Sequence, residues 1–270
     1  MTRPSTQTGI EDGHRARKRF GQNFLTDAGV IAQIVSAIAP KQSDVMLEIG
    51  PGLGALTCAL LPHLPALTVV ELDRDLIPKL KTRCQAAGMA EKLTVRAEDA
   101  LQLSLTPNGQ RQRIVGNLPY NIGTPLIFHL LDQAAHIQDM TFMLQKEVVD
   151  RLAAEPGSRD YGRLSLTVQA RAAVEPLFIV PPTAFNPPPK VDSAIVRLTP
   201  HLEPRVPPAL WPTFNELVTL AFSQRRKTLG NTLKPLRTAD ELLAAGIDPI
   251  RRAETLDLDD FLRLARQRHR

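Results

Sequence analysis

The sequence predicts an α/β protein with a mostly parallel sheet, followed by a small all-helical domain. Short apolar runs rich in β-branched residues alternate with segments of helical periodicity up to about residue 200. Beyond that point the apolar spacing is helical throughout, with no strand-like run between the helical segments. A Pro-rich stretch, residues 201–212, has the composition of a linker between the two parts.

Five segments have the length and composition of strands. Each is short and apolar, and most are bounded by Gly, Asp or Asn. Because helical segments lie between them, we expect a parallel sheet joined by right-handed crossovers. The expected strands are residues 44–50, 67–73, 93–99, 113–117 and 141–146.

The helices alternate with these strands and then continue alone. Residues 26–40 begin with a Thr or Asp that suits an N-cap and end at Pro40, while residues 124–134 begin with a cap-then-proline pair. Residues 73–84 carry Pro78 near the first turn, where proline is tolerated. We therefore expect a basic tail (1–19), a first domain (20–200) and a helical domain (201–270), with helices at 213–222, 227–236, 239–246 and 258–268.

Composition limits the environment and the partners. The 270 residues include 43% hydrophobic residues but no apolar run of membrane-spanning length, and the N-terminus has no apolar signal core. Two cysteines without metal-ligand spacing indicate a reducing compartment, so we expect a cytoplasmic protein. The net charge is +5, and positive residues concentrate in 223–234 and 263–270. Each stretch fits a solvated helical face or a nucleic-acid contact about equally well.

Residues 47–57, "LEIGPGLGALT", have the order strand, glycine-rich turn, helix. Gly50, Gly52 and Gly54 allow a tight turn and close approach of a ligand to the backbone. Two cofactor classes use such a turn. The spacing loosely fits a dinucleotide fingerprint, and it also fits the turn that binds S-adenosylmethionine (SAM).

Acidic residues follow the next two expected strands. Glu71, with Asp73 as the alternative, can accept hydrogen bonds from both ribose hydroxyls, which NAD and SAM share. Asp99 can accept from an adenine amine. Each acid alone fits a helix N-cap or a solvated turn nearly as well. Their succession after the glycine turn favours a cofactor that contains a nucleoside.

Residues 117–120, "NLPY", follow the fourth expected strand. In isolation this tetrad would be a Pro-containing turn with Tyr120 in the core. At a strand end it suits methylation of an adenine amine, a poor nucleophile whose lone pair is delocalised into the ring. The Asn117 side-chain oxygen and the Leu118 carbonyl can accept from that amine, Pro119 restricts the turn, and Tyr120 can stack on the base. A sulfonium is a good leaving group, so no metal is needed, whereas hydride transfer has no use for this tetrad.

Several motifs together resemble the small-subunit ribosomal RNA adenine dimethyltransferase A family. The resemblance implies a Rossmann-like class I SAM-dependent methyltransferase domain. It also implies dimethylation of the exocyclic amines of two adjacent adenosines in a hairpin near the rRNA 3′ end, on a nearly mature small subunit. It covers about residues 17–234, and we expect a monomer without metal or membrane. The motifs, in order, are "KRFGQNFL", "LEIGPGLGALT", "ELD", "GNLPYNIGTPL", "MLQKEV", "YGRLS" and "FNPPPKVDSAIVRL".

The resemblance adds site residues that the chemistry alone does not select. It makes Asn23 and Leu25 cofactor contacts, with Gly50 and Gly52 in the glycine turn, and sets Phe20 and Phe24 beside the transfer site. Phe185, on a loop stiffened by prolines, would be either a core residue or a second ring that stacks on the base opposite Tyr120. The expected phosphate contacts are Lys190, Arg225, Arg226 and Lys227.

Other functions remain open at this point. A related group methylates one large-subunit adenosine and confers macrolide resistance, and it shares the cofactor motifs and the tetrad. A ribosome-assembly factor or mitochondrial transcription factor could keep the fold as a binding module, although Asn117, Tyr120 and Glu71 favour retained catalysis. A DNA adenine methyltransferase would also keep the tetrad, but the chain has no separate segment typical of a base-specific recognition domain.

Overall fold

The computed structural model describes most of the chain beyond the expected basic tail. Residues 1–19 lie largely outside the described part, and Phe20 lies outside it as well. The exception is a short antiparallel pair, β1 (Ile10–Glu11) and β2 (His14–Arg15). The described residues are 10–11, 14–15, 23–105 and 109–267.

The chain forms two compact units. The sheet unit comprises Met1–Val149 and Glu175–Pro200, and the helical unit comprises Asp150–Val174 and His201–Arg270. One division falls at residue 200, where the Pro-rich stretch begins. Residues 150–174, expected in the first domain, instead group with the C-terminal helices, because their apolar side chains share a core with those helices.

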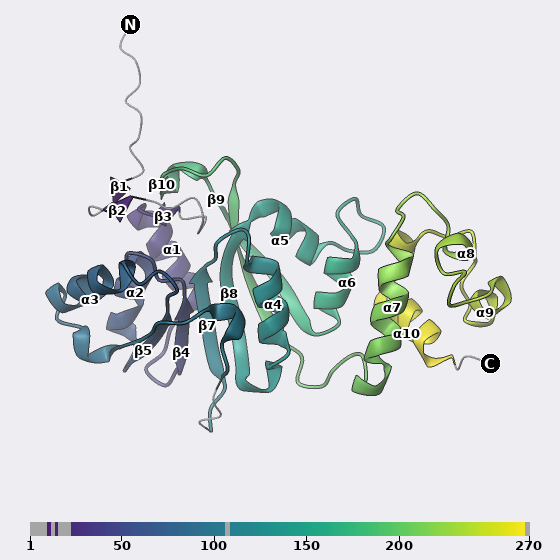
Figure 1. Ribbon diagram of the computed structural model, residues 1–270, viewed down its shortest axis with the longest axis horizontal. Helices are drawn as coiled ribbons and strands as arrows, with labels where there is room; N and C mark the ends of the chain where they lie inside the picture. Colours follow the sequence, from purple (N-terminus) through teal and green to yellow (C-terminus); the bar gives the residue numbers. More distant parts are fainter. Residues whose placement is uncertain (1–9, 12–13, 16–22, 106–108, 268–270) are drawn as a thin grey trace, which may run out of the picture. The chain divides into compact units, whose positions relative to one another are not determined.

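A seven-stranded sheet organises the sheet unit, in the order β6-β5-β4-β7-β8-β11-β9. Figure 1 labels five of these strands, β5, β4, β7, β8 and β9. Neighbouring strands from β6 to β8 are parallel, and β11 runs antiparallel to β8. A separate antiparallel pair joins β3 to β10. The bounds are β3 (Phe24–Leu25), β4 (Met46–Ile49), β5 (Leu67–Val70), β6 (Leu93–Arg96), β7 (Gln112–Asn117), β8 (Ile137–Gln145), β9 (Ala172–Val180), β10 (Phe185–Asn186) and β11 (Ser193–Pro200).

The five predicted strands are all present, and the parallel arrangement is confirmed. Strand β8 starts at Ile137, four residues before the predicted start. Strands β9 and β11 were not predicted. Pro176 interrupts the apolar run of β9, and β11 follows a Pro-rich segment, so both patterns are weak strand signals.

Helices α1, α2 and α3 share one apolar cluster with the sheet. Ile34, Leu56 and Leu80 pack in it with Val69 and Val115. Helix α1 begins where Asp27 accepts a hydrogen bond from the Val30 N–H, as the capping pattern predicts. The helices of this unit are α1 (Ala28–Ile38), α2 (Ala55–Leu60), α3 (Leu76–Ala86) and α4 (Gly123–Leu131), and α5 (Lys146–Ala153) leads into the helical unit. Short 3₁₀ turns lie at Leu61–His63, Ala90–Lys92, Ala100–Gln102, Ala134–His136 and Pro182–Ala184.

The strand order reverses between β4 and β7, which lie side by side although β5 and β6 separate them in the chain. Such a switch point opens a crevice at the carboxyl ends of the strands. Close approach of the two strands requires Gly116, because a Cβ there would lie 2.4 Å from the Ile49 carbonyl oxygen. The crevice therefore lies between the glycine turn after β4 and the "NLPY" segment after β7.

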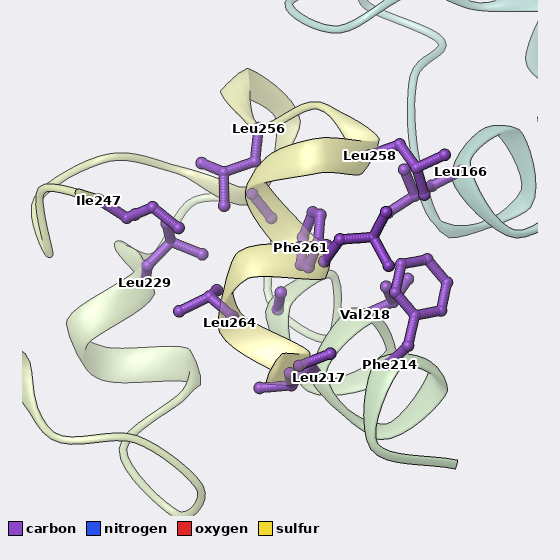
Figure 2. Close-up of a cluster of buried hydrophobic side chains, with 14 of the residues drawn as sticks. Leu166, Phe214, Leu217, Val218, Leu229, Ile247, Leu256, Leu258, Phe261 and Leu264 are labelled. Atoms are coloured by element: carbon purple, nitrogen blue, oxygen red, sulfur yellow. The ribbon is translucent and has the colours of Figure 1, made fainter. Parts of the chain in front are cut away.

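The helical unit has its own apolar core (Figure 2). Phe261 is fully buried in it and packs against the rings of Phe214 and Phe222. Capping boxes begin two of the helices, through Thr238 in α9 and Asp257 in α10. Its remaining elements are α6 (Arg163–Gln169), α7 (Trp211–Ala221), α8 (Leu229–Thr232), α9 (Ala239–Ala244) and α10 (Leu258–Arg266), with 3₁₀ turns at Pro208–Leu210 and Ala253–Thr255.

Among the described residues, none of the helices has the length and apolar character needed to cross a membrane.

Candidate active site

A cavity of about 300 Å³ opens at the carboxyl ends of the parallel strands. This size falls at the lower end of the range for small-molecule sites. The turns that follow β3, β4, β5, β6 and β7 all contribute to its wall. Every expected cofactor contact and every expected catalytic residue lines it, namely Asn23, Leu25, Gly50, Gly52, Glu71, Asp99, Asn117, Leu118, Pro119, Tyr120 and Phe185.

The glycine turn and Glu71 form one hydrogen-bonded wall. Gly50 and Gly52 have φ of +67° and +57°, a left-handed conformation that favours glycine. The Glu71 carboxylate accepts from the Gly52 N–H at 3.2 Å and from the Asp73 N–H at 2.8 Å. Each oxygen keeps a further lone pair for a ligand hydroxyl. Burial raises the pKa of Glu71, and the two backbone N–H groups oppose part of that rise.

Asp73 and Asp99 line the same cavity while they hold their own turns. An Asp73 carboxylate oxygen accepts from the Asp75 N–H at 3.2 Å, next to the start of α3. Asp99 accepts from the Leu101 N–H at 2.9 Å and caps a 3₁₀ turn. The capping and ligand interpretations of Asp99 are therefore compatible. Asp73 is 3% exposed and Glu71 is 8% exposed, so burial does not separate the two candidates for the ribose contact.

Asn117 is the last residue of β7, and one hydrogen bond holds its side chain. Its amide nitrogen donates to the Asn23 carbonyl at 3.3 Å, which leaves the amide oxygen outside that bond. The Leu118 side chain is buried, so its backbone is the part that can meet a ligand. Tyr120 lines the cavity, and its hydroxyl shares a hydrogen bond of 3.0 Å with Ser193. Burial raises the pKa of Tyr120, so the phenol stays protonated at neutral pH.

Phe185 fits the core interpretation that the sequence left open, and it lies in the cavity wall as well. It is 4% exposed and belongs to the apolar cluster of the sheet unit, as a core residue does. It also lines the cavity, where it pairs through the backbone with Leu25. Phe24 lies across from Gly52, with its ring 3.4 Å from where a Cβ on that glycine would be.

Glu48 lies within the glycine motif, residues 47–57, but the sequence pattern predicted no role for it. Its carboxyl is 2% exposed, lines the cavity and accepts a 2.6 Å hydrogen bond from the Thr57 hydroxyl. Burial raises the pKa of Glu48 to about 7. The hydrogen bond from Thr57 opposes this rise, and the nearby charge of Glu71 adds a smaller rise. Ser193 was also missed, because β11 was not predicted. Its contact with Tyr120 spans 73 positions of the chain, so assignment of that strand alone would not have revealed it.

The expected phosphate contacts lie outside the cavity lining. Lys190, Arg225, Arg226 and Lys227 are all exposed. The Arg225 guanidinium lies 3.3 Å from the Glu254 carboxylate and also donates to the Arg159 carbonyl, so part of its hydrogen-bonding capacity is already used.

The cavity wall fits an adenosine-containing methyl donor. Glu71 offers acceptors for ribose hydroxyls and Asp99 for an amine, while the side-chain-free surface of Gly52 leaves room that a Cβ would fill. Among the described residues, no group of three or more His, Cys, Asp or Glu side chains is arranged to hold a metal ion.

Comparison with known proteins identifies the family. The model for "Ribosomal RNA adenine dimethylase" matches residues 13–268. This chain belongs to that family. A Pseudomonas aeruginosa relative named "Ribosomal RNA small subunit methyltransferase A" is 57% identical, covering 94% of this chain and 95% of its own. A Cupriavidus metallidurans relative of the same name is 51% identical, covering 96% and 95%.

Two solved structures share the fold. A dimethyladenosine transferase from Plasmodium falciparum superposes with a TM-score of 0.78 at 31% identity, covering 89% of this chain and 95% of that one. The 23S rRNA methyltransferase ErmE gives 0.71 at 28% identity, covering 90% and 98%. The predicted fold class, a class I methyltransferase with a helical C-terminal part, is confirmed. As a member of the rRNA adenine dimethylase family, the chain is a SAM-dependent methyltransferase.

Proposed function

We propose that this enzyme transfers methyl groups from SAM to the N6 amines of two adjacent adenosines in the 3′-terminal hairpin of small-subunit rRNA. The product would be a pair of N6,N6-dimethyladenosines. The names of the relatives support the small subunit as the source of the substrate, and the family description supports dimethylation of adenine. The observation that carries the proposal is Asn117, whose amide nitrogen is held by Asn23 in the wall of a cavity that also contains Glu71 and Tyr120.

In this proposal the residues after β7 act on the adenine amine. In the first transfer the Asn117 side-chain oxygen and the Leu118 carbonyl accept hydrogen bonds from the two amine hydrogens. In the second transfer one of them accepts from the single hydrogen that the monomethylated amine keeps. These bonds draw the nitrogen lone pair out of conjugation and stabilise the positive charge that develops on nitrogen. The amide orientation follows from the bond to Asn23, which uses the nitrogen and not the oxygen. Pro119 restricts the turn, and the rings of Tyr120 and Phe185 hold the extruded base.

Residues from the earlier strands bind the methyl donor. SAM supplies a methyl group on a positively charged sulfur, so positioning contributes much of the catalysis. Glu71 accepts from the ribose hydroxyls and Asp99 from the adenine amine of the cofactor. Asn23, Leu25, Gly50 and Gly52 present backbone groups or open surface to it. No side chain needs to act as a strong base, because the amine acquires acidic protons only after methyl transfer.

The helical unit and Lys190 serve RNA binding in this proposal. Lys190, Arg226 and Lys227 are exposed cations that suit phosphate groups. The proposal further includes a monomeric enzyme acting on a nearly mature small subunit. A cytoplasmic location follows from that substrate, since ribosomal subunits mature and work there.

The RNA contacts can be tested by reversing the charge of two exposed cations in the basic stretch 223–234. In Arg226→Glu/Lys227→Glu, we expect weaker binding to small subunits and a salt slope of log K reduced by about one per lost phosphate contact. Binding measured between low and moderate salt checks this, with Lys81→Glu, an exposed lysine of the sheet unit outside both basic stretches, as a control. An unchanged slope would identify these residues as a solvated helix start.

The reaction itself can be tested with labelled SAM. The purified enzyme would be offered small subunits, large subunits and naked rRNA, all from cells that lack the modification, and the methylated bases would be mapped. We expect label on two adjacent adenosines in small subunits. Label on one large-subunit adenosine would assign the enzyme to the activity that ErmE's name describes. Binding to small subunits without label would indicate an assembly factor.

A further inference from the structure

Tyr120 reaches from the turn after β7 to a strand far away in the sequence. Its hydroxyl and the Ser193 hydroxyl share a hydrogen bond of 3.0 Å, across 73 positions of the chain. Tyr120 belongs to the wall of the cavity, whereas Ser193 is absent from the lining and only 1% exposed. The serine therefore contacts the tyrosine hydroxyl from outside the cavity lining.

Ser193 lies in a strand, whereas the tyrosine that it contacts lies in a turn. Ser193 opens β11 and pairs with Gln145 of β8, inside the seven-stranded sheet. Tyr120 belongs to no strand or helix, and it is only half-buried. A hydrogen bond to the tyrosine hydroxyl restrains the first side-chain torsion, because the oxygen moves when the Cα–Cβ bond turns. The bond therefore sets where the ring lies, although the ring can still turn about its own axis.

We infer that Ser193 is a positioning residue for methyl transfer: it holds the ring of Tyr120 at the place in the cavity wall where the target adenine stacks. This inference rests on the proposed function, since it takes Tyr120 as the stacking ring. Ser193 touches neither the cofactor nor the base in this account. It also connects Tyr120 to the segment that carries Phe185, because the loop between Phe185 and β11 ends at Ser193.

Kinetics give the first test. Ser193→Ala should lower kcat by roughly 3- to 10-fold, the value of one neutral hydrogen bond, while KM for the small subunit and Kd for SAM stay near wild type. Tyr120→Phe removes the same bond from the other side and should lower kcat similarly. The double variant should be no slower than the slower single variant, because only one interaction is lost. Ser193→Thr retains a hydroxyl and should recover most of the rate.

A second test reports the ring directly. The chain has two tyrosines, Tyr120 and Tyr161, so selective ¹³C labelling of tyrosine gives two sets of ring signals, which Tyr120→Phe assigns. In Ser193→Ala we expect shifted ring signals for Tyr120, because the ring moves when the hydrogen bond at its hydroxyl is lost. Tyr161 is the internal control, because its hydroxyl is held by the Leu256 carbonyl in the helical unit.

A buried serine elsewhere controls for general destabilisation. Ser165→Ala removes a fully buried hydroxyl that donates to the Arg151 carbonyl, and it should lower stability without changing kcat below the unfolding temperature. Wild-type kcat in Ser193→Ala, or effects of Ser193→Ala and Tyr120→Phe that multiply in the double variant, would overturn the inference. If Ser193→Ala does not fold, Tyr120→Phe and Ser193→Thr still test it. Failure of the wild-type enzyme to methylate adenosine would instead refute the proposed function.

Discussion

The two ends of strand β7 use polar side chains in opposite ways. Arg113, near its start, is buried and donates to both carboxylate oxygens of Asp139 at 3.0 and 3.1 Å. It also donates to Asp44 at 2.8 Å and to the carbonyls of Ile38 and Ala39 at the end of α1. Asn117, at the other end of the strand, has one hydrogen bond from its amide nitrogen and faces a cavity.

This difference separates polar groups that stabilise the fold from those that bind. A buried guanidinium is tolerated only when it is paired and its donors are used, and the five bonds of Arg113 meet that condition. Burial alone would lower the pKa of Arg113. The bonds to Asp139 and Asp44 outweigh this effect and raise the pKa above its usual value, so the charge is kept. A group that must receive a ligand has to keep hydrogen-bonding capacity. Asn117 does so at its amide oxygen, and Glu71 does so through the remaining lone pairs of its carboxylate.

The largest effect is expected at the start of β7, where Arg113 is buried and paired. Arg113→Met should lower the free energy of unfolding by about 3–5 kcal/mol, because two buried carboxylates lose their partner. Denaturant titration of the variant and wild type measures this. A control is Arg197→Met, whose pairing with Glu175 is more exposed and should matter less. A loss below about 1 kcal/mol would show that the network contributes little.

The next largest effect is expected at the other end of β7, where Asn117 faces the cavity. Asn117→Ala should lower the single-turnover rate of methyl transfer by about 10²- to 10³-fold, the usual cost of one preorganised group that stabilises the transition state. SAM affinity should change much less, because the proposed partner is the reacting amine. Rapid-quench measurement at saturating SAM checks the rate. Near-normal turnover with lost SAM binding would assign Asn117 to the cofactor alone.

Glu48 lies between the two extremes, since it is buried like Arg113 but lines the cavity like Asn117. Its pKa is raised from 4.5 to about 7, so the folded state binds its proton more tightly. Its contribution to stability is full below about pH 4.5 and is lost as pH rises through 7. Glu48→Gln should therefore gain up to about 3 kcal/mol over wild type between pH 5 and pH 8.

Unfolding of both proteins in denaturant at pH 5 and pH 8 gives this difference. Glu91→Gln, an exposed carboxylate of the sheet unit, is the matched control and should show no such change. The same stability difference at both pH values would contradict a raised pKa for Glu48.

The smallest effect is expected at Glu71. Glu71→Gln keeps the shape but weakens the acceptors, so SAM binding should fall by about 1.5–3 kcal/mol, or roughly 10- to 100-fold in Kd. The rate at saturating SAM should fall much less. Calorimetric titration with SAM measures the affinity, and Asp73→Asn tests the alternative ribose ligand. A larger loss in Asp73→Asn than in Glu71→Gln would exchange the two roles.

Residues that lie next to each other in the chain were the easiest to predict. The glycine turn, Glu71, Asp99 and the "NLPY" tetrad each follow a parallel strand directly, and parallel strands bring their carboxyl ends to one edge. The five strands and the capped start of α1 follow from local periodicity for the same reason.

The features that could not be predicted depend on contacts between residues far apart in the chain. The bond from Asn117 to Asn23 spans 94 positions and that from Tyr120 to Ser193 spans 73. No local pattern specifies such a pair before the sheet order is known. Likewise, residues 150–174 join the helical unit because Leu166 and Ala170 pack in its core, although they precede the predicted boundary.

The most direct test of the contrast between the two ends of β7 is a crossed measurement on Arg113→Met and Asn117→Ala. Each variant would be assayed, at a temperature where both are folded, for unfolding free energy and for single-turnover methyl transfer. We expect Asn117→Ala to keep wild-type stability and lose the reaction, and Arg113→Met to keep the reaction and lose stability. If both variants lost both properties in parallel, the two ends would not have the separate roles proposed for them.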